Sequence, residues 1–365
     1  MLVSEVIDFL EQLAPKKLAE DFDNVGLLVG NSFNKVNGIL VSLDITEDVL
    51  DEAIKNNTNL IVSFHPIIFD GLKTVREDGN YVQKIVVKAI QNNLNIFAIH
   101  TSLDNARFGV NDQIGKKLGV KNYKVLIPKE NSLLKLTTYI PKEYFDSVKQ
   151  AIFDAGAGKI GNYDSCSFSH EGIGTFKPME NANPFIGEKN KLFEDSEIKF
   201  SVVFSSELEQ KVIKSLLENH PYEEVAYEIV HLKNKNQFIG MGGIGELEEE
   251  IAPEIFLERI KSIFNIPFIK HTKLLDKKIK KIAFIGGSGS FGIKNAIQQN
   301  ADIFLTADLK YHNFFEAENK IILADIGHFE SEQFTKELIV GYLKEKINKF
   351  AILESTTRTN PVYYK

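Results

Sequence analysis

Short apolar segments of strand length alternate along this chain with segments in which apolar residues recur at helical spacing. In the first third, the pattern predicts strands at 36–43, 59–63 and 95–99, and helices at 47–56 and 81–92. The alternation returns near the end, with strands beginning at Lys281 and at Asp302, a strand at 320–326 and a helix at 330–347. Parallel strands need a long crossover, usually a helix, between them. The sequence therefore predicts an α/β core of parallel βα units.

The middle of the chain has a different order of predicted elements. Its strands are expected at 134–140, 165–169, 198–204 and 225–232, with helices at 143–155 and 206–218. Two consecutive βαβ units of this length are typical of a ferredoxin-like domain. We therefore expect three segments: a first part of the core at 1–127, an inserted ferredoxin-like α+β domain at 128–235, and the second part of the core at 236–365.

Composition limits the classes of partner. The 365 residues carry a net charge of -7, which gives no general electrostatic attraction for nucleic acid or for an anionic membrane. A single cysteine, Cys166, excludes a disulfide framework within the chain and fits a reducing compartment. The first 17 residues mix apolar and acidic residues at helical spacing, unlike a signal peptide. We expect a cytoplasmic protein without a membrane-spanning segment.

Polar residues with metal-ligating side chains follow several of the predicted core strands, namely His65, His100, Asp104, His328 and Glu332. Ligands of open α/β sheets collect outside the carboxyl ends of the strands. His328 and Glu332 are four residues apart, so a helix through them presents both side chains on one face. Imidazole and carboxylate suit zinc, iron or manganese and select poorly among them. The pattern predicts a divalent-metal site of unspecified metal.

A glycine loop follows the strand that begins at Lys281. Gly287, Gly289 and Gly292 satisfy G-x-G-x-x-G, with Asp308 about where a dinucleotide fold places its ribose carboxylate. The alternative is a tight strand-to-helix turn, which is favoured because the motif lies in the last quarter, with few βα units left to complete a dinucleotide fold. In either case the amides of Gly286, Gly287 and Gly289 are candidates to hold a phosphate or carboxylate.

Six motifs in this order resemble the proteins labelled GTP cyclohydrolase 1 type 2 homologs, also called NIF-three-like proteins. They are FDNVGLLVG at 22–30, SFHPIIF at 63–69, HTSLDN at 100–105, GGSGS at 286–290, DLKYH at 308–312 and DIGHFESE at 325–332. The middle segments GKIGNYDSCSF at 158–168 and HPYEEVA at 220–226 resemble the inserted domain of the long family members, which is similar to PII and CutA proteins.

The resemblance implies a pair of divalent metals in each subunit of a ring-shaped homohexamer, with ligands at His65, Asp104, His328 and Glu332. One position departs from the family pattern: Phe64 stands where members usually have a histidine, and phenylalanine cannot coordinate. His65, His328 and Glu332 can still form a three-ligand centre with an open position. A second ion would depend on Asp104 and a bridging Glu332, with water or His100.

Two functions remain open on these residues. The first is metal-dependent hydrolysis of a nucleotide or another phosphorylated or heterocyclic small molecule, with Asp308 or His312 as acid or base. For His312, a role in orienting a metal ligand through a hydrogen bond is an equal alternative. The second function is a non-catalytic metal carrier, sensor or ring-forming scaffold. The family label suggests GTP, but none of these residues reads guanine.

Overall fold

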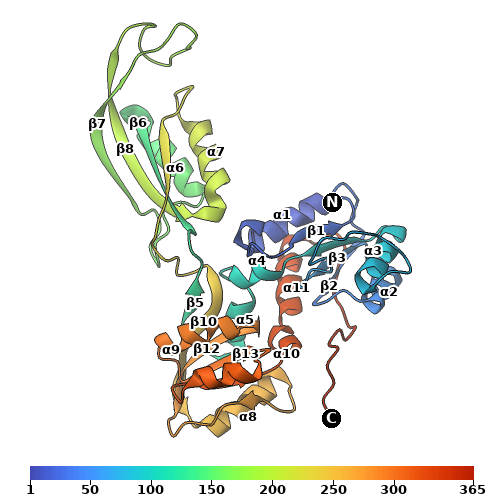
Figure 1. Cartoon of the computed structure of the whole chain (residues 1–365). Helices are drawn as coiled ribbons and strands as arrows, with labels where there is room; N and C mark the ends of the chain where they lie inside the picture. The colour runs from blue at the N-terminus through green and yellow to red at the C-terminus, as the bar shows by residue number, and fades with distance from the viewer. The chain divides into compact units, whose positions relative to one another are not determined.

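The computed structural model describes residues 1–365, which form two compact units. The larger unit joins Met1–Pro128 to Phe238–Lys365, and the smaller unit is the intervening Lys129–Gln237 (Figure 1). The structure is mixed α/β and contains three separate sheets. None of its helices has the length and apolar character that a membrane span requires.

The first sheet of the larger unit has five strands, and its inner strands are parallel as the sequence predicts. Their spatial order is β1 (Gly26–Val29), β4 (Asn95–Ala98), β3 (Leu60–Ser63), β2 (Gly38–Ser42) and β15 (Ala351–Glu354). The pairs β15–β2, β2–β3 and β3–β4 are parallel, whereas β1 joins the edge antiparallel to β4. The last strand of this sheet therefore comes from the far end of the chain.

The second sheet of the larger unit has six strands and mixed direction. Their order is β11 (Lys270–His271), β14 (Ile322–Asp325), β13 (Ile303–Ala307), β12 (Ile279–Ser288), β10 (Gly240–Ile251) and β5 (Lys121–Pro128). β12, β13 and β14 are parallel, and the remaining pairs are antiparallel. The three parallel strands are the ones that carry the glycine loop, Asp308 and His328 at their carboxyl ends.

Successive residues of the central strands enter two different cores, as the two-residue period of a strand requires. Ile39 and Val41 of β2 pack in one large core together with Ile282 and Phe284 of β12. That core also contains residues of α1 (Val3–Leu13), α5 (Val110–Leu118), α8 (Pro253–Phe264) and α11 (Thr335–Lys346). The two sheets thus share a central apolar layer, which explains why these strands are apolar on both faces.

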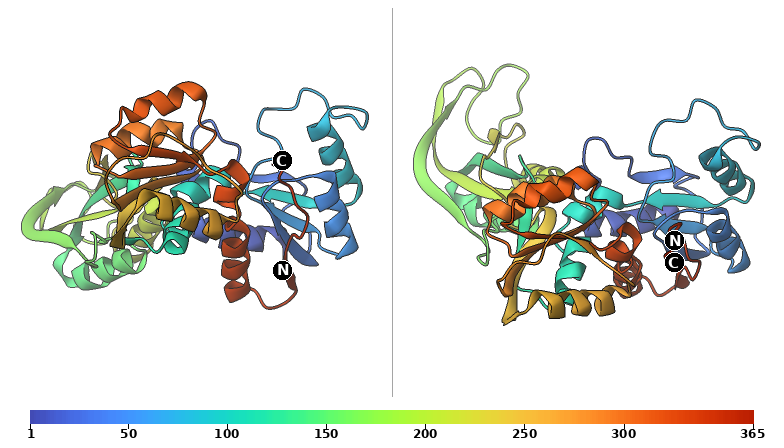
Figure 2. Two further views of the ribbon diagram at one scale, coloured as in Figure 1. Left: turned by 90° about the horizontal axis from the view of Figure 1, so that it is seen from below. Right: turned by 60° about the horizontal axis from the view of Figure 1, so that its bottom comes forward.

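The outer faces of the two sheets have their own helices (Figure 2). Leu40 of β2 packs with α2 (Glu47–Lys55) and α3 (Tyr81–Gln91), and Phe304 of β13 packs with α9 (Ile293–Gln298) and the 3₁₀ helix η5 (Tyr311–Ala317). Thr46 caps α2 as its position in the sequence predicts, because its hydroxyl accepts a hydrogen bond from Val49 N at 3.2 Å.

The predicted helix at 330–347 is divided in the structure. It consists of a short helix α10 (His328–Glu332) and the separate helix α11. Gly327, with φ of 87°, ends the preceding loop in a conformation that L side chains rarely adopt, so that α10 begins at once with His328. The ligand candidates His328 and Glu332 therefore lie on a one-turn helix of their own.

The smaller unit contains one antiparallel sheet. Its elements follow the order β6 (Leu133–Pro141), α6 (Phe145–Asp154), β7 (Ser167–Phe176), β8 (Phe193–Ser205), α7 (Glu209–Asn219) and β9 (Tyr227–His231). The strand order in space is β7-β8-β6-β9, and both helices pack on one face of the sheet. β7 is longer than predicted, because it continues beyond Ser169 to Phe176.

Candidate metal centre

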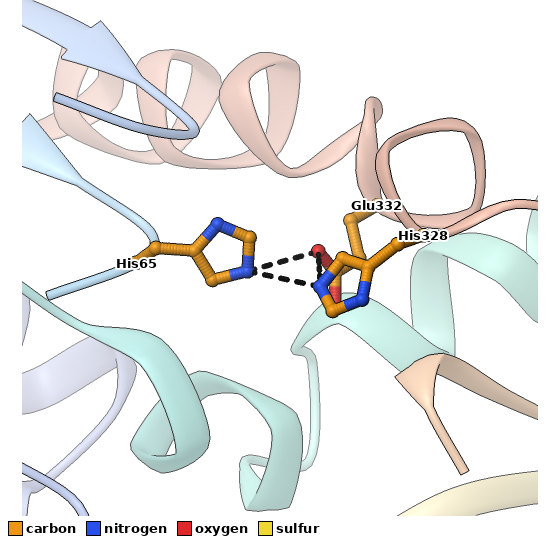
Figure 3. Close-up of side chains that lie close together, drawn as sticks. All are labelled: His65, His328 and Glu332. Atoms are coloured by element: carbon orange, nitrogen blue, oxygen red, sulfur yellow. Dashed lines mark hydrogen bonds and ion pairs between the residues drawn. The ribbon is translucent and has the colours of Figure 1, made fainter. Parts of the chain in front are cut away.

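Three donor atoms converge between the two sheets of the larger unit. His65 Nε2 lies 3.1 Å and His328 Nε2 lies 3.2 Å from Glu332 Oε2. The two Nε2 atoms are 3.3 Å apart. Figure 3 shows that the His65 ring faces the His328 ring and the Glu332 carboxylate from the opposite side. These residues form a group in which all ligand atoms lie within 4.8 Å of one another.

Local backbone structure positions each of the three side chains. His65 follows β3, and its amide donates to Leu43 O at 2.8 Å, so the chain past the strand is held against the neighbouring strand end. His328 and Glu332 are at i and i+4 of α10 and therefore share one face, as the sequence predicts. The ends of strands from two different sheets thus bring His65, His328 and Glu332 together.

An aspartate orients each imidazole. Asp44 Oδ1 lies 2.8 Å from His65 Nδ1, and Asp308 Oδ2 lies 2.6 Å from His328 Nδ1. An ionised carboxylate can only accept a hydrogen bond, so Nδ1 carries the proton in both rings. The free lone pair of each ring is then on Nε2, pointing toward Glu332. This is the carboxylate–histidine arrangement that orients metal-ligating histidines in proteins.

The donor set fits a divalent cation. Glu332 is only 4 % exposed, and its Oε2 has no hydrogen-bond partner despite the short distances to the two rings. Three electron-pair donors at such separations repel one another unless a proton or a metal ion lies among them. Two imidazoles and one carboxylate with room for further ligands are typical of zinc and of non-haem iron sites. The group therefore has the chemistry of a metal centre without specifying the metal.

Without a metal, protons take its place. Burial opposes ionisation of His65, but the contacts with Asp44 and Glu332 prevail and raise its pKa to about 10. Burial likewise opposes ionisation of His328, while Glu332 and Asp308 raise its pKa to about 9. Burial favours neutral Glu332, yet the two histidines lower its pKa to about 2. The carboxylates of the group therefore stabilise positive charge at this point, carried either by protons on the two imidazoles or by a bound metal ion.

Asp104 and His100, the other ligand candidates of the amino-terminal half, lie outside the three-atom group. Asp104, on α4 (His100–Asn105), is buried, and its Oδ1 has no hydrogen-bond partner. Burial and the charge of Glu332 raise its pKa well above the usual range. His100 Nδ1 lies 2.8 Å from Asp23 Oδ1. A third imidazole–aspartate pair therefore stands near an unsatisfied carboxylate.

Phe64 occupies the position of the expected extra histidine. Its side chain is fully buried in the central core. The ring centroid lies 5.0 Å from that of His65 and 5.5 Å from that of His100. The His65 and His100 centroids are themselves 5.4 Å apart, so the three rings pack against one another. A ring that cannot coordinate therefore stands beside both imidazoles, and the group contains three ligand residues.

The glycine loop shapes this centre. Gly287 has φ of 66°, and a Cβ atom there would lie 2.2 Å from Glu332 Oε1. Gly286 N donates to Asn111 Oδ1 at 3.2 Å, and Gly287 N donates to Ser331 Oγ at 2.9 Å. Because these two amides are already engaged, the expected phosphate or carboxylate cradle at Gly286, Gly287 and Gly289 is not formed by the first two. Glycine is required here for the close approach of Glu332.

The two predicted acid–base residues have different surroundings. Asp308 contacts both His328 Nδ1 and Ser288 Oγ, and although burial opposes this, these hydrogen bonds lower its pKa. It is therefore ionised and orients His328. His312 is exposed on η5, and its ring lies next to Tyr311 and Phe315. The structure does not bring His312 to the group.

Sequence reasoning missed several residues of the site. Asp44 and Asp23 could have been found by the rule that selected the histidines, because each is a carboxylate at the end of a strand or in a loop and contacts a predicted ligand. The carboxyl-terminal segment carries no such signal: Thr359 Oγ1 donates to Asp44 Oδ2 at 2.6 Å, and Asn360 Nδ2 donates to Glu330 Oε1 at 2.9 Å. A cavity of about 540 Å³ lies beside His65 and His328, with Asn360 and Tyr364 in its wall.

The fold and the group together define a mixed α/β protein with a candidate metal site between two sheets of one unit. The chain belongs to the Duf34/NIF3 (NGG1p interacting factor 3) family, whose model matches residues 1–361. It is 37% identical over 369 residues to the GTP cyclohydrolase 1 type 2 homolog of Staphylococcus epidermidis, covering all of both chains. The Bacillus subtilis homolog of the same name is 36% identical over 363 residues, covering 98% of this chain and 97% of its own.

A solved structure agrees with this assignment. The crystal structure of a Bacillus cereus protein related to NIF3 superposes with a TM-score of 0.87 at 35% sequence identity. The match covers 100% of this chain and 99% of that chain. The family resemblance predicted from the six motifs is thereby confirmed.

Proposed function

We propose that this protein binds a divalent cation through His65, His328 and Glu332 and acts as a metal-dependent hydrolase. The observation that carries the proposal is the convergence of two Nε2 atoms and one carboxylate oxygen, each imidazole being held at Nδ1 by an aspartate. A divalent cation bound there supplies Lewis-acid chemistry that activates water for attack on carbon or phosphorus. Zinc, iron and manganese all suit this donor set.

The protein's own residues have distinct roles in this proposal. Asp44 and Asp308 fix the tautomers of His65 and His328, so that both lone pairs point to one place. Gly287 leaves room for Glu332 Oε1, because any side chain there would displace it. Asp104, a buried carboxyl with an unsatisfied oxygen, is suited to hold a proton or, together with His100 or water, a second cation. His312 acts as an acid or base only if η5 moves toward the group.

The substrate class follows from the cavity beside the centre and from the relatives' name. The wall of this cavity includes the carboxylates of Asp325 and Glu330. The lysine in the wall, Lys270, forms an ion pair in which its Nζ lies 2.7 Å from Asp325 Oδ2. With no free basic side chain in that wall, a phosphate or other anionic group depends on the bound cation for charge compensation. We propose a nucleotide or another phosphorylated or heterocyclic small molecule, as the name GTP cyclohydrolase 1 type 2 homolog suggests.

The remaining expectations belong to the same proposal. The βαββαβ order and the strand order β7-β8-β6-β9 of the smaller unit support a ferredoxin-like domain inserted into the core. A cytoplasmic ring-shaped homohexamer rests on the family resemblance. The alternative function, a metal carrier or sensor without turnover, is favoured by Phe64, because a depleted second site matters less for a carrier than for a two-metal hydrolase.

The test is turnover of metal-loaded full-length protein on nucleoside triphosphates and cyclic and linear phosphoesters. We expect hydrolysis that falls about a hundredfold or more in His65→Ala and in Glu332→Gln, since each removes a ligand. His271→Ala is the matched control, because His271 is exposed and its imidazole contacts the adjacent Thr272 O. Tight metal binding without hydrolysis of any of these substrates contradicts the enzyme and supports the carrier.

A further inference from the structure

The smaller unit contains a buried carboxylate on a sheet face where solvated side chains are expected. In β8, Phe200, Val202 and Phe204 pack with the helices, so the alternate residues face the other way. Glu197 belongs to this other face, opposite Gly172 of β7, yet it is only 9% exposed. Residues of the long loop between β7 and β8, which Figure 1 shows at the end of this unit, line a cavity of about 780 Å³ together with Glu197.

Glu197 has no cationic partner in this setting. Its Oε1 accepts a hydrogen bond from Tyr222 OH at 3.0 Å, and no ion pair is formed. Lys199, which faces the same way two residues along the strand, instead lies 5.8 Å from the centre of the Tyr139 ring. Burial and the neighbouring Asp195 raise the pKa of the Glu197 carboxyl. A buried carboxyl without a cationic partner lowers the stability of the folded state, and a cationic ligand would offset this cost.

Aromatic rings surround this carboxyl. Tyr139, Phe176, Phe185 and Tyr222 line the cavity. The Tyr222 ring lies 5.9 Å from Phe176 and 6.3 Å from Phe185. The loop between β7 and β8 is tied down, because Asn183 N donates to Glu223 Oε1 at 2.8 Å and Asn190 N donates to Pro178 O at 2.7 Å. The cavity is therefore a built feature of suitable size for a small ligand.

Glycine keeps this space open. A Cβ atom on Gly174 would lie 2.1 Å from Glu197 Oε2. Gly172 faces Glu197 directly in the sheet and adds no side chain. On the Glu197 face β7 thus has no side chain at these two positions, and the printed hydrogen bond of the carboxyl engages Oε1 rather than Oε2.

We propose that this cavity binds a small organic cation, in which an ammonium group contacts Glu197 and an aromatic or alkyl body packs among Tyr139, Phe176, Phe185 and Tyr222. Aromatic faces attract cations through the ring quadrupole, and the attraction grows when the site is desolvated. The cavity wall also contains Lys177, Lys199, Glu223 and Glu224, and among these charges the buried Glu197 carboxylate is the one that would compensate the ammonium group. This site is independent of the metal centre, and its ligand would act on the inserted unit alone.

The test compares three probes with one aromatic body: phenethylammonium, 2-phenylethanol and phenylacetate, titrated into the full-length protein by ligand-observed nuclear magnetic resonance. Phenethylammonium should bind about tenfold tighter than the alcohol or more, and phenylacetate weakest. Glu197→Gln should remove this preference while leaving the alcohol unchanged. Glu194→Gln, an exposed position on the same strand, is the matched control and should change nothing.

A second variant tests the proposal independently, in case Glu197→Gln fails to fold. Phe185 is 52% exposed on the loop between β7 and β8, so Phe185→Ala removes a wall of the cavity without opening the core. We expect it to weaken phenethylammonium binding about threefold or more. Equal affinity for the amine and the alcohol, an equal loss in Glu194→Gln, or no binding of the amine at ten millimolar would overturn the proposal.

Discussion

The Nε2 atoms of His65 and His328 lie 3.3 Å apart, although the two residues are separated by 263 positions in the chain. His65 follows a strand of the five-stranded sheet, and His328 follows a strand of the six-stranded sheet. The candidate metal site therefore forms only when both sheets have folded and packed on their common core. A metal bound there should stabilise the larger unit as a whole, because the unfolded chain offers no equivalent site.

The two orienting aspartates give the first prediction. Asp44→Asn and Asp308→Asn should each weaken metal affinity about 10- to 100-fold, since an amide no longer fixes Nδ1–H in the neighbouring imidazole. Calorimetric titration of zinc into metal-free protein measures the change. Asp276→Asn, at an exposed position without an ion pair, is the control. Unchanged affinity in both variants would show that the aspartates do not orient the ligands.

Gly287 gives the second prediction. Gly287→Ala introduces a Cβ atom 2.2 Å from Glu332 Oε1 at a backbone φ of 66°, so the carboxylate must move and the backbone is strained. We expect weaker metal binding and a free energy of unfolding lower by about 1–3 kcal/mol. Gly71→Ala is the matched control, because nothing lies within 4 Å of a Cβ there. Normal metal binding by Gly287→Ala would contradict the role of glycine in admitting Glu332.

The pH dependence of stability tests the anchoring of the carboxyl-terminal segment. Glu52 accepts hydrogen bonds from Ser355, Thr356 and Thr357, which prevail over burial and lower its pKa from 4.5 to about 2. A lowered pKa means that this stabilisation is fully present above pH 4.5 and is lost as the pH falls toward 2.

The corresponding measurement is thermal unfolding across this pH range. In Glu52→Gln the melting temperature should fall less steeply with acid than in the unmodified protein, because the variant has no carboxylate to protonate. Glu249→Gln, at an exposed position without an ion pair, should follow the unmodified protein. Identical acid dependence in all three proteins would contradict the anchoring role of Glu52.

Phe64 gives the fourth prediction. Phe64→His places an imidazole beside both His65 and His100 and adds a possible ligand for an ion held by Asp104, whose Oδ1 is unsatisfied. We expect it to raise the metal bound per chain from one ion to two, with a lower melting temperature in the metal-free state because a polar ring enters the core. Phe64→Leu is the control for the loss of the aromatic ring. One ion in both variants would show that the second site needs more than this ligand.

The strands and most helices were predictable because local patterns determine them. The predicted helix at 47–56 corresponds to α2 at Glu47–Lys55, and the predicted strand at 59–63 to β3 at Leu60–Ser63. Pairing was harder to predict: β15 joins the amino-terminal sheet through contacts that no local pattern encodes. The division between α10 and α11, which falls at Gln333 and Phe334, was also missed, because apolar spacing continues across it and no glycine or proline marks it.

The candidate site was predictable where side-chain type and strand ends coincide. That rule found His65, His328 and Glu332, which the structure brings together. It also selected His312, which lies on an exposed 3₁₀ helix, because strand ends do not specify which way the following loop turns. Residues that act through others, such as Thr359 and Asn360, depend on the path of the carboxyl-terminal segment and had no signal in the sequence.

The most direct test of the metal centre is the metal content per chain, measured by elemental analysis on the purified protein and on the His65→Ala and Glu332→Gln variants. We predict at least one zinc, iron or manganese ion per chain in the unmodified protein and nearly complete loss in both variants, with His271→Ala unchanged. Metal retained at the same stoichiometry in His65→Ala and Glu332→Gln would contradict the assignment of these side chains as ligands.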